Sequence, residues 1–142
     1  MSMELKNRLL LVSRYHLFNI LIFNLLYNIA SGFSSSFGYA LIGSLMFNGL
    51  AGIMNLIIVL VLEKLRIENN LISSLILFVL FIFTFDLSAA IVDQSSIIKL
   101  INLITHGERT FSLYAEIILT FSGILAFFIA INFPDKRVKT NL

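Results

Sequence analysis

The sequence predicts an all-α membrane protein, a polytopic four-helix transmembrane bundle that forms a single membrane domain over residues 1–142. Of those residues, 58% are hydrophobic and 13% are charged, whereas soluble domains are about 45–50% apolar and about 25% charged. A soluble fold of this size has no interior large enough to hide so much apolar surface, and lipid is the solvent that accepts it. The apolar residues also gather into four windows, each longer than the roughly 20 residues that a helix needs to cross a bilayer.

The four windows are separated by stretches with turn-forming chemistry. The spans are expected at about residues 9–30, 37–62, 71–92 and 111–133. They are divided by a run of small polar residues (SGFSSS), a charged stretch closed by two asparagines (EKLRIENN) and a helix-capping sequence (DQSS). Pro134 stands just beyond the fourth span, where a helix is expected to stop.

The stretch between the third and fourth spans, SIIKLINLITHGER at residues 96–109, is too short to cross a membrane. Ile97, Ile101 and Ile104 recur there at helical spacing. This pattern predicts a short helix that lies in the membrane interface and ends at Gly107. The alternative is that the fourth helix simply begins early.

The distribution of lysine and arginine predicts that both termini lie in the cytoplasm. Three basic residues precede or begin the first span, two lie between the second and third, and three follow the fourth, against two between the third and fourth. Cytoplasmic loops carry the excess of such residues. The first span contains Arg14, Asn19 and Asn24 and is longer than the core of a signal peptide, so we expect it to be retained. We expect an inner (plasma) membrane of the bacterial type.

One face of the second span carries small or polar residues at intervals of four, and these are Ala40, Ser44, Asn48 and Gly52. In lipid there is little hydrophobic force between helices, so close backbone approach and interhelical hydrogen bonds must hold them together. We therefore expect the second span to lie at the centre of the bundle. We also expect a seam of this kind to favour oligomerisation or docking to other membrane proteins.

Two carboxylates, Asp86 and Glu116, interrupt the third and fourth spans. In the expected topology both lie roughly 7–9 Å below the outer boundary of the membrane. Polar residues of the first two spans should approach them, and these are Asn24, Asn28, Ser44 and Asn48. We predict a polar pocket in the outer half of the bundle, which is either a proton or cation site or a structural set of hydrogen bonds. The nearest expected cations are Arg109 and His106, in the loop between the third and fourth spans.

Several function classes find no support in the sequence. The absence of cysteine excludes disulfides, thiolate catalysis and Cys-ligated metal sites. Neither a GxSxG nor an HExxH motif occurs. His16 and His106 are expected on opposite sides of the membrane, where they cannot ligate one metal ion or haem together. We therefore expect no metal and no cofactor. We also expect no nucleic acid partner, because the basic residues sit at segment ends, which suits lipid headgroups.

Three functional hypotheses follow from these patterns. The first is a small non-enzymatic integral membrane protein that acts by intramembrane association, as an accessory, regulatory or immunity-type subunit. Its partners would be the lipid bilayer and either other membrane protein subunits or copies of itself. The second is a small homo-oligomeric ion channel, or a proton- or cation-coupled transporter, that uses Asp86 and Glu116. The third is a membrane-embedded enzyme that acts on a lipid through its paired carboxylates.

Overall fold

The computed structural model describes residues 3–32, 37–65, 71–93, 97–107 and 111–133, and over these residues the chain is helical. The described helices are α1 (Met3–Ala30), α2 (Phe37–Lys64), α3 (Leu71–Asp93), α4 (Ile97–Thr105) and α5 (Phe111–Asn132). The all-α prediction is therefore confirmed. The open question about residues 96–109 is also settled, because α4 is a separate helix rather than an early start of α5. That the whole chain forms one domain stays a prediction.

In the described part of the chain, four helices are long and apolar enough to cross a membrane: α1, α2, α3 and α5. Large apolar side chains cover their outward faces; Leu21, Ile53 and Val79, for example, are each more than half exposed. Such a surface is stable only in lipid. The chain is an integral membrane protein with four candidate spans. The first span begins earlier than expected, because α1 already starts at Met3.

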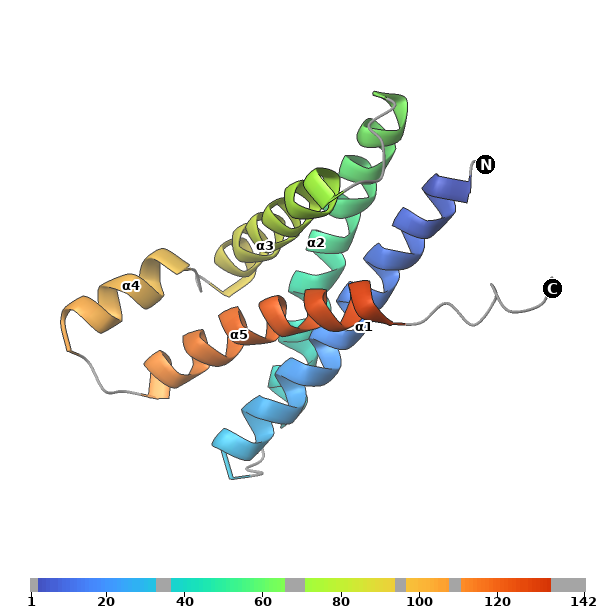
Figure 1. Ribbon diagram of the computed structural model, residues 1–142. Coiled ribbons are helices and arrows are strands. Elements are labelled where there is room, and N and C mark those ends of the chain that lie inside the picture. The colour runs from blue at the N-terminus through green and yellow to red at the C-terminus, as the bar shows by residue number, and fades with distance from the viewer. Residues whose placement is uncertain (1–2, 33–36, 66–70, 94–96, 108–110, 134–142) are drawn as a thin grey trace.

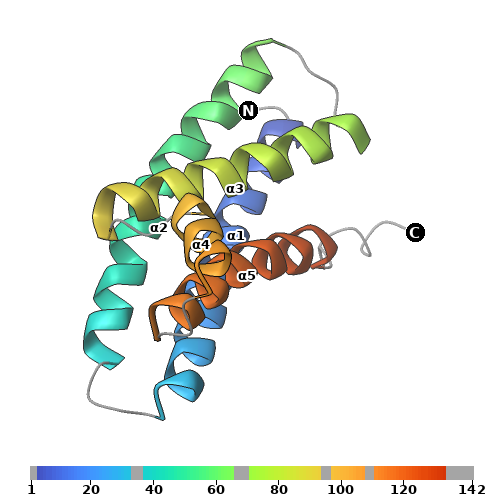
Figure 2. The ribbon, with the colours of Figure 1, turned by 90° about the vertical axis from the view of Figure 1, so that its left-hand side faces the viewer.

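The four long helices pack in a closed order. The helix α1 packs on both α2 and α5, α2 packs on α3, α3 packs on α5, and the short α4 lies against α5 (Figure 1). The first two helices run alongside each other, whereas α3 and α5 lie across them (Figure 2). The helix α1 therefore lies between α2 and α5, its two main neighbours, and its inward side chains contribute to most of the core.

Aromatic rings fill the core where these helices meet. Tyr15 of α1 is fully buried, and its ring centroid lies 5.2 Å from that of Phe81 in α3 and 6.2 Å from that of Phe127 in α5. A second cluster joins Phe47 of α2 to Phe85 of α3, with ring centroids 5.3 Å apart and nearly perpendicular planes. Edge-to-face pairs of this kind contribute about 0.5–1.5 kcal/mol beyond their buried area.

Two glycines end helices in the left-handed backbone region. Gly32 follows α1 with φ 66°, and Gly107 follows α4 with φ 69°. Glycine adopts this conformation without the steric cost that a Cβ atom would bring. The N–H of Gly107 donates to the carbonyl of Ile104 over 3.1 Å, so α4 ends where its sequence predicts.

Gly123 is the tightest glycine contact among the described helices. A Cβ atom at this position would lie 3.3 Å from Cδ1 of Phe85 and 3.5 Å from the hydroxyl of Tyr15. The glycine therefore lets α5 approach the aromatic core closely. Gly49 of α2 is different, because a Cβ atom there would have no heavy atom of the described structure within 4 Å.

We expect Gly123→Leu to lower the free energy of unfolding by about 1–3 kcal/mol, because the added side chain overpacks the aromatic core. The matched substitution Gly49→Leu should leave stability unchanged or slightly raised, since it adds a helix-favouring residue in open space. Reversible unfolding in mixed detergent micelles measures both values. Equal losses in the two variants would contradict the packing described here.

Candidate functional site

A buried histidine connects three of the spans through hydrogen bonds. His16 of α1 lies with its Nδ1 atom 2.9 Å from Oδ1 of Asn48 and its Nε2 atom 3.1 Å from Nδ2 of Asn55, both in α2. The hydroxyl of Thr84 in α3 donates to Oδ1 of Asn55 over 2.7 Å. The side chains of all four residues are buried. We call these four residues the His16 network.

The partners of His16 define its hydrogen-bonding state. A carboxamide oxygen can only accept, so Nδ1 of His16 donates its hydrogen to Asn48. A carboxamide NH2 group donates, so Nε2 accepts from Asn55. This is the neutral imidazole with its hydrogen on Nδ1. Asn48 thus turns its carboxamide oxygen toward His16, and Asn55 turns its NH2 group toward it. The oxygen of Asn55 is then free to accept the hydrogen bond from Thr84.

The predicted seam of the second span faces α1 of the same chain. The buried Asn48 also donates to Oδ1 of Asn19 over 3.1 Å, and the buried Ser44 accepts from Nδ2 of Asn24 over 2.7 Å. A Cβ atom on Gly52 would lie 3.5 Å from the ring of His16. Ala40, one turn before Ser44, packs against the second aromatic cluster. The seam thus holds α1 against α2, with Ser44 and Asn48 buried and Ala40 and Gly52 half-buried.

Glu116 is a buried acid that pairs with a cation. Only 2% of this residue is exposed, and its Oε1 atom lies 3.0 Å from Nζ of Lys99 in α4. Lys99 is thus a cation partner of Glu116 in addition to the expected Arg109 and His106, whose proximity to this acid stays a prediction. Arg109 itself lies outside the described residues. The ion pair fixes the short helix α4 to the start of α5 and provides the charge that the buried carboxylate needs.

Asp86 has different surroundings from Glu116. It is half-buried and borders a cavity of about 10 Å³ together with residues of α3 and α5, namely Ile82, Phe85, Leu119 and Thr120. That volume holds about one water molecule. That Asp86 and Glu116 share one polar pocket with the asparagines and serine of the first two spans stays a prediction. Asn24 donates to Ser44 of α2, whereas the buried Asn28 donates to the backbone oxygen of Asn24 in its own helix over 2.6 Å.

Sequence patterns alone identify only part of the His16 network. Asn48 belongs to the predicted seam, and Asn55 follows it by two helical turns on the same face, which is the signal that points to both. Thr84 is a single polar residue in an apolar span, and nothing in the sequence pairs it with Asn55. The pairing of Lys99 with Glu116 could not be predicted either, because it depends on how α4 folds back on α5. Among the described residues no cluster of three or more His, Asp or Glu side chains is placed to hold a metal ion.

No protein-family model, curated protein or solved structure matches this chain.

We expect Asn48→Leu to destabilise the protein by about 1–2 kcal/mol, because it leaves the Nδ1 hydrogen of His16 without an acceptor in a site that water cannot reach. Reversible unfolding in mixed micelles measures the loss. A double-mutant cycle with His16→Leu should return a coupling energy of about 0.5–1.7 kcal/mol.

Asn132→Leu is the control for this change, because Asn132 is exposed and bonds only to the backbone of its own helix among the described contacts. It should cost less than about 0.5 kcal/mol. A coupling energy of zero between positions 16 and 48 would show that the network contributes nothing to stability.

Proposed function

We propose that this four-span membrane protein is non-enzymatic and acts by association with other membrane proteins, as an accessory, regulatory or immunity-type subunit. The observation that supports this proposal is that the interior side chains mainly contact one another. The polar side chains of α1 and α2 bond to one another, and aromatic rings fill the core beside them. The interior thereby serves the fold, and the lipid-facing surface is the part available for interaction.

The outward face of α2 suits close approach by another helix. At Gly38, Gly43 and Gly49 a Cβ atom would meet no heavy atom of the described structure within 4 Å. Between them stand exposed apolar residues such as Ile42 and Met46. Small residues among apolar ones allow two backbones to pack tightly in lipid. We propose that both termini are cytoplasmic in a plasma-type membrane, as the distribution of basic residues indicates.

We expect the tagged protein, purified in mild detergent from its native membrane, to carry a second, different protein in fixed stoichiometry. Native mass spectrometry gives the mass and composition of the particle. A particle that contains only copies of this chain contradicts the proposal and favours a homo-oligomeric channel or transporter.

The variant Gly49→Leu sharpens this experiment, because it should weaken the complex while leaving the fold intact. Ile53→Leu is its control, since it keeps the volume of an exposed side chain on the same helix. If neither variant changes the particle and the complex persists, the interface lies on another helix, which cross-linking from Leu21, Val79 and Phe121 would locate.

A second function, a proton- or cation-coupled transporter, is favoured by one specific observation. Glu116 is almost fully buried, and its Oε2 atom has no hydrogen-bond partner among the described residues. Its cation, Lys99, is 41% exposed and belongs to a short helix. Buried acids with an exchangeable partner are typical of ion and proton pathways in membranes.

If this second function holds, Glu116→Gln and Asp86→Asn should each abolish proton or cation flux, or shift its pH dependence, in reconstituted liposomes. Glu63→Gln, at the last turn of α2, is the control and should leave flux unchanged. Detergent gel filtration must show that the variants remain folded. Unchanged flux in both acid variants would exclude a role for these carboxylates in transport.

A further inference from the structure

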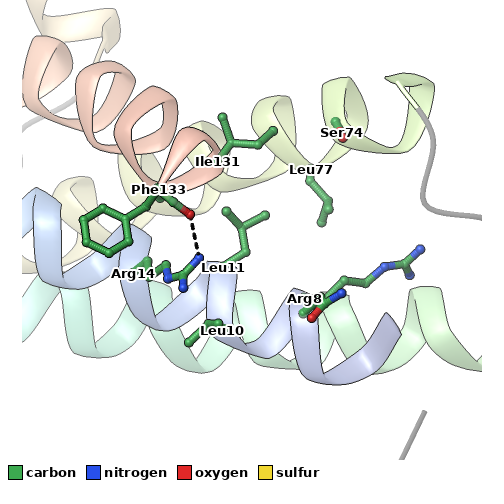
Figure 3. A pocket seen from close by; sticks show the side chains of 10 residues that line it. Arg8, Leu10, Leu11, Arg14, Ser74, Leu77, Ile131 and Phe133 are labelled. Carbon is green, nitrogen blue, oxygen red and sulfur yellow. Dashed lines mark hydrogen bonds between the residues drawn. The ribbon is translucent and has the colours of Figure 1, made fainter. Parts of the chain in front are cut away.

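A cavity opens at the end of the bundle opposite to the connection between α1 and α2. It has a volume of about 270 Å³ and lies between the first turns of α1, the start of α3 and the end of α5. Arg8 and Arg14 border it from α1, with Leu11 between them, and Ser74 and Leu77 of α3 lie across from them (Figure 3).

The charged side chains of the cavity lining come from α1. The described lining contains two arginines and no carboxylate. Arg8 is 2% exposed, so its guanidinium group lies within the protein, where Glu4 of the preceding turn accepts a hydrogen bond from it over 2.6 Å. Arg8 and Glu4 therefore form an ion pair that offsets the charge of Arg8, and Arg14 supplies the cation at the edge of the cavity.

Arg14 is held in place at the edge of the cavity. Its Nη1 atom donates to the backbone oxygen of Phe133 over 3.1 Å, and its guanidinium lies 5.2 Å from the centroid of the Phe133 ring. These contacts orient the side chain before any ligand arrives. A guanidinium has five N–H donors in a planar fork, so it can bond a protein acceptor and a phosphate oxygen together.

Most of the other lining residues are apolar. Leu10, Leu11, Leu77, Ala130 and Ile131 form this part of the surface. A cavity with cationic groups on one part of its wall and aliphatic groups on another matches a molecule with an anionic head and a hydrocarbon body. The bilayer around the protein supplies such molecules at high concentration.

We propose that this cavity binds the phosphate headgroup of an anionic phospholipid, with Arg14 facing the phosphate and the leucines facing the start of the acyl chains. The proposed cytoplasmic position of the termini places the cavity in the leaflet where anionic lipids concentrate. Basic pockets between membrane helices on that side are suited to such headgroups. The proposal is independent of whether the protein acts as a subunit or as a transporter.

The experiment measures lipid adducts on the full-length protein by native mass spectrometry, during titration with phosphatidylglycerol and, separately, phosphatidylcholine. Phosphatidylglycerol should bind at least about tenfold more tightly, and Arg14→Gln should remove most of that preference. Arg14→Lys should retain part of it, because lysine keeps the charge without the planar fork.

Two further variants keep the test decisive. Lys6→Gln removes an exposed charge of the same helix that does not line the cavity, and it should leave the preference unchanged. Ser74→Leu fills the cavity without changing charge, and it should weaken phosphatidylglycerol binding even if Arg14→Gln fails to fold. Equal losses in Lys6→Gln and Arg14→Gln would overturn the proposal in favour of general surface attraction.

Inorganic phosphate and glycerol phosphate distinguish a lipid site from a site for a soluble phosphate. We expect neither, at millimolar concentration, to displace bound phosphatidylglycerol, because they lack the hydrocarbon part that contacts the leucines. If either soluble anion binds in an Arg14-dependent manner while the lipid does not, the cavity is not a lipid site.

Discussion

The hydrogen bonds of His16 are the constraint around which the rest of this structure is arranged. In a hydrocarbon interior an imidazole and three polar side chains cannot be satisfied by water, so they must satisfy one another. Asn48 and Asn55 of α2 bind the two ring nitrogens, and Thr84 of α3 completes the set. Because apolar side chains gain little by leaving lipid for a neighbouring helix, these few polar contacts and the ring packing beside them determine which faces of the helices meet.

The contacts of α5 follow from that arrangement. Tyr15 stands next to His16 in α1, and it meets Phe127 of α5 as well as Phe81 of α3. The face of α1 that presents the histidine thus also presents the ring that the last span packs against. At the other end of α5, Glu116 holds α4 through Lys99. The polar groups within the described bundle therefore act mainly as connections between helices, which leaves the outward surface for contacts with lipid and other proteins.

Hydropathy and breaks in the chain were sufficient to predict the four spans, because length and apolar content are properties of each segment alone. The polar face of α1 was also predictable, since an asparagine or histidine turned toward lipid would be unsatisfied. The pairs of side chains that bond to each other could not be predicted in this way. Whether His16 meets Asn48 or another amide depends on the rotation and depth of α1 against α2, and no single segment encodes these. Lys99 shows the same limit, because its partner is defined only once α4 lies on α5.

The uneven hydropathy of the spans has a consequence for how the chain enters the membrane. Over its most apolar 18 residues, α1 has a mean hydropathy of 1.6, against 2.3 for the second span and 2.6 for the third. Its polar side chains find their partners in α2, the next segment to be synthesised. A lone α1 would expose an imidazole and several amides to lipid, and the arrival of α2 offsets that cost. The first two spans are thus built to insert as a helical hairpin, with the third and fifth helices added to it.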